Sequence, residues 1–197
     1  MQPTIIISDP EQAEDRLKSF GVTKDDIAVV VDAVVAAKGD MIAADAAIAA
    51  GTQAYLAGVR HTRLLFLSKG WEKHNESNIE AVKSSENGIR VIYQNVDQAC
   101  RESVSPQAIS GKGTAARRMI EPQGMLFSPK ALPEMVNPKF FQNETQYWFL
   151  CISAIWVPSD DGSGERISVA AELSWRNSTW VWIGRLGAAW RPQSRAT

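Results

Sequence analysis

The amino-acid sequence predicts an α+β fold in which an N-terminal helical layer packs on an antiparallel sheet. Helix signals gather before residue 70, whereas strand patterns gather after residue 78. This order argues against a parallel, doubly wound sheet. The chain has 197 residues and 45% hydrophobic content, enough for one well-buried core, so we expect a single domain. Its expected parts are a helical part (1–70), a hairpin region (71–97), an irregular excursion (98–145) and a tryptophan-rich antiparallel sheet (146–190).

Two helices are marked by residues that favour helix ends. The apolar run Ile5–Ile7 fits a short strand and leads into the first helix, which Asp9 can cap and Gly21 ends. A second helix starts after Thr23, with a carboxylate three residues later as in a capping box. Its run 27–37 is apolar nearly all round, so we expect this helix to be buried.

The alanine-rich segment 41–58 predicts a third helix, because alanine has the highest helix propensity. Two continuations fit the sequence. The helix runs on through residues 59–67 as one long helix, or it breaks at Gly58 and a strand follows at Leu64–Leu67.

The hairpin over residues 79–96 is predicted by two strand-like runs on either side of a turn. The runs are 79–82 and 89–96, and Asn87 and Gly88 form the turn between them.

A polar segment, 72–78, precedes this hairpin, and we predict it to be a solvated loop. Within it Glu72, His74 and Glu76 alternate, so in an extended segment they would share one face and could hold a divalent metal. We weigh this alternative against the polar loop and predict no metal site.

The stretch 146–186 predicts a three-stranded meander. Its first strand, 146–157, is apolar on both faces and should lie inside the sheet with something packed on each surface. In the second strand, 166–176, polar residues such as Glu172 alternate with apolar ones, which is typical of a half-exposed strand. The third strand is expected at 180–186.

Tryptophans are more numerous in the C-terminal half than one core needs. We expect some of them to form an exposed patch that contacts a partner or a second copy of the chain, as in a homodimer. The alternative is that they pack between the sheet and the helices. The tryptophans concerned are Trp148, Trp156, Trp175, Trp180, Trp182 and Trp190.

Charge and cysteine content exclude several classes of protein. A net charge of -1 and a pI near 6.1 give no general attraction to DNA or to an anionic membrane, so a nucleic-acid contact would need a local basic patch. Cys100 and Cys151 form no CxxC motif or cluster with histidine, so we expect no disulfide framework, zinc site, catalytic thiol or cofactor. The most apolar segment, 27–37, is too short to span a membrane and contains Asp32, which predicts a cytoplasmic protein.

The excursion 98–145 is expected to be irregular, because prolines and glycines interrupt each of its apolar runs. Ser110–Thr114 has glycines that let backbone amides approach an anion, although its spacing is not that of a P-loop. Lys112, Arg117 and Arg118 are therefore our candidates for a phosphate or nucleic-acid contact. The alternative is a flexible turn that leads into a basic helix.

The string Gln-Gly-Met-Leu-Phe at residues 123–127 resembles the bacterial sliding-clamp-binding pentapeptide, Gln-x-x-Leu-Phe. The resemblance covers five residues. It implies that Gln123 makes polar contacts at the rim of a pocket and that Leu126 and Phe127 fill an apolar cleft. Together with Met125, these are the candidate partner-binding residues. In the alternative interpretation, Met125, Leu126 and Phe127 anchor the loop to the core.

Three short sequence segments resemble segments of uncharacterised proteins carried by bacterial prophages and plasmids. They are Tyr93–Asp97, Ile109–Gly113 and Gln123–Phe127. The resemblance implies a phage or mobile-element accessory protein but attaches no activity to it.

Two classes of function follow from these observations. The first is a non-enzymatic accessory protein that binds a host protein or a nucleic-acid-associated complex, such as a sliding clamp or a defence complex. The second is an enzyme that acts on a phosphorylated or nucleotide substrate, with the basic residues near position 115 and an acid such as Asp97 or Glu121.

Overall fold

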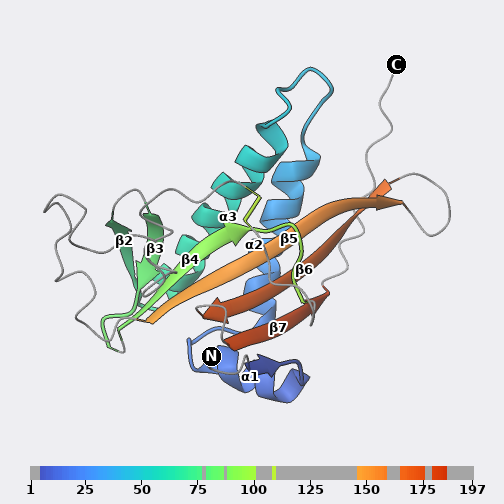
Figure 1. Ribbon diagram of the computed structural model, residues 1–197. Coiled ribbons are helices and arrows are strands. Elements are labelled where there is room, and N and C mark those ends of the chain that lie inside the picture. The colour runs from blue at the N-terminus through green and yellow to red at the C-terminus, as the bar shows by residue number, and fades with distance from the viewer. Residues whose placement is uncertain are drawn as a thin grey trace, which may run out of the picture.

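The computed structural model has the predicted α+β class, with helices that precede most of the strands (Figure 1). It describes residues 5–76, 79–86, 88–100, 108–109, 146–158, 165–175 and 179–185. Its helices are α1 (Pro10–Lys18), α2 (Lys24–Gly39) and α3 (Ala49–Ser68). Its strands are β1 (Ile5–Ile7), β2 (Glu72–Glu76), β3 (Ile79–Lys83), β4 (Ile89–Asn95), β5 (Gln146–Pro158), β6 (Glu165–Trp175) and β7 (Thr179–Arg185).

Within the described residues the strands form one mixed sheet in the order β1-β7-β6-β5-β4-β3-β2. The hairpin β3–β4 and the meander β5–β6–β7 are antiparallel, as predicted. The two parts are joined in parallel, however, through β4 and β5, and β1 pairs with β7 in parallel. A parallel pair needs a long connection between its strands, and residues 96–145 supply that length between β4 and β5.

The helix ends of α1 and α2 confirm the predicted caps. Asp9 accepts a hydrogen bond from the Gln12 backbone N–H at 3.0 Å. At the start of α2, the Thr23 backbone N–H donates to Asp26 Oδ2 at 2.9 Å, and the Asp26 backbone N–H donates to Thr23 Oγ1 at 3.1 Å. These two bonds form a capping box, which satisfies backbone donors that the helix itself leaves without partners.

The third helix starts later than the alanine-rich segment predicted. Residues 40–48 turn, with the Ile42 backbone N–H bonded to Asp45 Oδ2 at 2.7 Å, and α3 begins at Ala49. The helix then continues through Gly58 to Ser68, so one long helix is correct and a strand at Leu64–Leu67 is wrong. Gly58 serves a close contact, because a Cβ at this position would lie 2.0 Å from the Tyr93 ring.

The segment predicted as a polar loop contains β2, which pairs with β3 at the edge of the sheet. The prediction of a loop is wrong because an edge strand needs no apolar run. Charged side chains on an edge strand also discourage pairing with other chains.

The main core lies between the helices and one face of the sheet. α3 contacts β2, β3 and β4, whereas α2 contacts β5 and β6 and α1 contacts β7 (Figure 1). Trp148 on β5 is buried here, with its ring 5.0 Å from that of Phe20 in an edge contact. Of the predicted tryptophan patch, Trp148 is therefore in the core, and the other side chains lie outside the described residues.

A smaller cluster covers the opposite face of β3, β4 and β5. Val96 and Ala99 pack there against Tyr147, Phe149 and Cys151. The prediction that 146–157 is buried on both faces is therefore confirmed for residues 147–154, whereas Gln146 and Ile155 are exposed. Within the described residues, no helix combines the length and the apolar character needed to cross a membrane.

Candidate functional site

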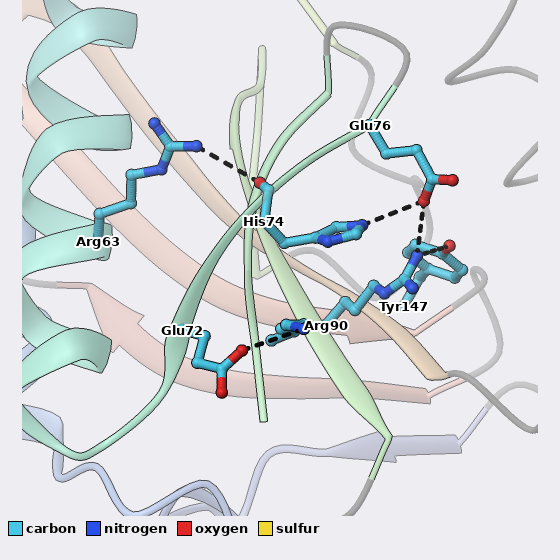
Figure 2. Close-up of polar contacts among 7 residues, drawn as sticks. Arg63, Glu72, His74, Glu76, Arg90 and Tyr147 are labelled. Carbon is cyan, nitrogen blue, oxygen red and sulfur yellow. Dashed lines mark hydrogen bonds and ion pairs between the residues drawn. The ribbon is translucent and has the colours of Figure 1, made fainter. Parts of the chain in front are cut away.

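A cluster of polar side chains lies on the face of β2–β5 opposite the helices (Figure 2). Arg90 is at its centre, with Nη1 3.2 Å from Glu76 Oε2 and 2.5 Å from the Tyr147 hydroxyl. Its guanidinium also lies over the Tyr147 ring, 5.3 Å from the ring centroid. His74 Nε2 approaches the same Glu76 oxygen at 3.1 Å. Glu76 is thus shared between an arginine and a histidine.

The expected alternation of Glu72, His74 and Glu76 on one face is present, because this segment is a strand. Glu72 binds Lys83 at 3.0 Å instead of approaching the other two side chains. Among the described residues no group of three or more metal-ligating side chains is arranged to hold a metal ion. Glu72 and Glu76 are therefore engaged with the cationic side chains of Lys83 and Arg90, and His74 is engaged with the Glu76 carboxylate.

The helix side of the same edge strand carries a second set of contacts. Arg63 on α3 donates to the His74 backbone carbonyl at 3.4 Å (Figure 2). It also forms an ion pair with Glu80 on β3. Asn75 donates to Glu80 Oε1 at 2.7 Å. Polar contacts from both faces thus fix β2 at the edge of the sheet, which indicates a structural role for this cluster.

Glu172, in the middle of β6, carries a carboxyl group that is 0% exposed. Its Oε2 accepts a hydrogen bond from the Cys100 backbone N–H at 2.7 Å, and its Oε1 has no hydrogen-bond partner among the described residues. Burial raises the pKa of Glu172, while the bond from Cys100 opposes that rise. The group therefore keeps its proton to higher pH than an exposed glutamate does.

The alternating pattern of β6 predicts that Glu172 lies on the solvent-exposed face. This prediction is wrong for Glu172, because its side chain is buried. Residues 96–100 cross this face of the sheet, where the Ser153 hydroxyl donates to the Asp97 carbonyl at 3.1 Å. The burial comes from a segment distant in sequence, so no local signal in β6 could have indicated it.

Cys100 adopts a backbone conformation that is rare for a residue with a side chain, with φ at 55°. Its Sγ donates to the Ala171 carbonyl at 3.3 Å, beside the point where the β6–β7 register shifts between Ala171 and Glu172. Such backbone costs about 1–3 kcal/mol and persists only where its surroundings hold it. The bonds to β6 provide that hold, and they fix residues 97–100 against the sheet.

Helices α2 and α3, and the turn that joins them, present aliphatic side chains to solvent. Each of the following is more than half exposed: Val29 62%, Ile42 64%, Ile48 77%, Leu56 51% and Leu64 57%. Burial all round α2 was predicted from its composition, and Val29 contradicts this, because the sheet covers only one side of the helix. The signal that the prediction missed is the spacing of Asp25, Val29, Asp32 and Ala36, which are all exposed.

We define the hairpin face as Val29 and Asp32 on α2 together with Leu56, Arg60 and Leu64 on α3, all exposed. The two helices lie side by side and are joined by the turn at residues 40–48 (Figure 1). Near their other ends, Asp26 Oδ2 lies 3.2 Å from Lys69 Nζ. Counting about 1.5 Å per residue from this ion pair, Asp32 and Arg60 differ in height by about one helical turn. The face thus has an acid on one helix, a base on the other, and aliphatic side chains around them.

The residues predicted to bind a partner or phosphate all lie outside the described residues. They are Lys112, Arg117, Arg118, Gln123, Met125, Leu126 and Phe127. Asp97, the acid named for the enzymatic alternative, is exposed, and its carboxylate accepts a hydrogen bond from the Gln98 backbone N–H at 2.8 Å.

Comparison of the chain with models of protein families, with curated proteins and with solved structures found no match.

Proposed function

We propose that this chain acts through contact between protein chains and that the hairpin face is its contact surface. The observation that carries the proposal is the group of aliphatic side chains on α2, α3 and their connection, each more than half exposed. Keeping such side chains in water is unfavourable, since full burial of one contributes about 1.5–3 kcal/mol. Exposed apolar side chains that gather on one surface mark interaction sites.

The architecture also suits a contact surface. Two helices present the face, and their opposite sides are packed on the sheet through buried residues such as Val30, Val34 and Phe66. A face built on packed helices keeps its shape when a partner binds, so little ordering entropy is lost. Asp32 and Arg60 would supply the orientation that aliphatic contacts alone do not give.

This role agrees with the non-enzymatic accessory protein expected from the sequence. Binding of a host protein such as a sliding clamp is a separate proposal that rests on the sequence alone. Its contact residues would be Gln123, Leu126 and Phe127. The two surfaces can be tested independently, because they lie in different parts of the chain.

The test is capture of partners by the tagged full chain from a bacterial lysate, followed by an affinity measurement with each purified candidate. We expect Leu56→Glu/Leu64→Glu to weaken binding at least about tenfold, because each substitution places a charge where an apolar contact is needed. The matched control, Ser8→Glu/Gln12→Glu, adds the same charge at exposed positions around α1 and should bind like the wild type.

Equal binding by the hairpin variant, the control and the wild type would overturn the proposal. Circular dichroism of each variant shows whether a loss of binding comes from the surface or from unfolding. A Leu126→Ala/Phe127→Ala variant, measured beside them, tests the sequence-based segment.

A further inference from the structure

We propose that the partner of the hairpin face is a second copy of this chain, so that two α2–α3 hairpins form a four-helix bundle between two sheets. This inference rests on the proposed function, because it names the partner for the same surface. Most soluble oligomers are symmetric, and in a twofold dimer one patch contacts its own copy.

The charges on the hairpin face are complementary to those on the hairpin face of a second copy related by a twofold axis. The acid, Asp32, is on α2, and the base, Arg60, is on α3. Within the described part of the chain, neither side chain forms an ion pair or hydrogen bond with another residue. Both are thus free to contact a second copy.

The heights of these two residues select one twofold axis. An axis parallel to the helices places α2 of one copy over α3 of the other and leaves every residue at its own height. Asp32 and Arg60 differ in height by only about one helical turn, which an arginine side chain can span. Each aspartate would therefore contact the arginine of the other copy. An axis perpendicular to the helices, at the height of these residues, would place α2 over α2 and bring like charges together.

The same axis also accounts for the apolar side chains on the outer surface. Val29, Leu56 and Leu64 of the two copies would interdigitate around the charge pairs, as in the core of a four-helix bundle. Both connecting turns would lie at the same end, which brings Ile42 and Ile48 of each copy together. All of these side chains are more than half exposed in one copy.

The test measures the mass and dimer dissociation constant of the full chain by light scattering and analytical ultracentrifugation. We expect wild type to dimerise, and D32R or R60D to raise the dissociation constant at least about tenfold, because each places like charges opposite each other twice. The double variant D32R/R60D, and an equimolar mixture of D32R with R60D, should return to within about threefold of wild type. Lys18→Glu, on α1, is the control for a change of net charge.

A monomeric wild type at the highest concentration measured would overturn the second copy as partner. So would a dimer that is insensitive to these substitutions and to Leu56→Glu/Leu64→Glu. The proposed function is overturned by a different result, namely that the same leucine variant still binds the partners that the wild type captures from lysate.

Discussion

Glu172 shows how a single buried group can set the pH dependence of this protein's stability. Its carboxyl is fully buried, and one of its oxygens has a hydrogen-bond donor in Cys100. Because burial raises its pKa, the folded protein binds this proton more tightly than the unfolded chain does. The stabilisation from this proton is complete below the pKa of an unfolded glutamate, about 4.3, and is lost as pH rises through the folded pKa.

We predict that Glu172→Gln removes this loss and makes the protein at least as stable as the wild type at neutral pH. Glutamine is neutral and keeps a side-chain oxygen that can accept from the Cys100 backbone N–H. The measurement is chemical denaturation of both proteins between about pH 4 and pH 8. Parallel curves for wild type and variant would contradict the role assigned to Glu172.

Glu172→Ala is the structural control for this experiment. It removes the carboxyl oxygen that accepts from the Cys100 N–H, so we expect a loss of about 1–3 kcal/mol that does not depend on protonation. Asp26 contributes in the opposite direction, because the Thr23 backbone N–H lowers its pKa and its stabilisation is lost as pH falls. The difference between wild type and Glu172→Gln isolates the buried group from that background.

At the scale of elements, the position of α3 on the sheet depends on a close approach between helix and strand. Gly58 allows the Tyr93 ring to touch the helix backbone. Tyr93 then donates to Asn95 Oδ1 at 2.5 Å, and Asn95 Nδ2 donates to the Gly51 carbonyl at 3.0 Å, in the first turn of α3. Packing and hydrogen bonds therefore hold α3 on β4 together.

Two glycines in α3 give a matched test of this contact. Alanine is favoured over glycine in a helix by about 1 kcal/mol, so without a clash both substitutions would stabilise the protein. A Cβ at Gly51 meets nothing within 4 Å, and we expect Gly51→Ala to gain up to about that amount.

For Gly58→Ala we expect the opposite sign. A Cβ 2.0 Å from the aromatic ring forces the helix or Tyr93 to move, and overpacking of this kind costs about 1–3 kcal/mol. Thermal or chemical denaturation of the two variants beside the wild type gives both values. A stabilised Gly58→Ala would show that α3 does not approach β4 this closely.

The elements also show which parts of the fold a sequence can predict. The caps at Asp9 and Thr23 and the turn at Gly88 are local signals, and each was predicted correctly. β2 was missed because a charged edge strand lacks the apolar pattern of a core strand. The burial of Glu172 was missed because the covering residues, 96–100, are far from it in the chain.

For the whole molecule, the proposed dimer predicts that thermal stability depends on protein concentration. If folded chains associate and unfolded chains do not, the midpoint of unfolding rises with concentration by mass action. We expect this rise for the wild type and a constant midpoint for Leu56→Glu/Leu64→Glu. Differential scanning calorimetry over a wide concentration range measures both, and a constant midpoint for the wild type would count against association of the folded chain.

The arrangement of the complete sheet could be predicted only in part. Residues within the hairpin and the meander pair with near neighbours in sequence, so their antiparallel pairing followed from strand spacing. The parallel pairing of β4 with β5 joins segments on either side of residues 96–145, and no local pattern specifies it. The hairpin face was missed for a similar reason, because only the packed structure shows which side of α2 the sheet leaves open.

The pairing of β1 with β7 has a consequence for cooperativity. Strand β1, in the first half of the chain, pairs with β7, in the second half. Strands β4 and β5 join the same two halves near the centre of the sheet. The two halves of the chain are therefore hydrogen-bonded to each other at two separate places in the sheet. We expect the two halves to unfold together, so that a destabilising substitution near Ile6 also lowers the stability of β4.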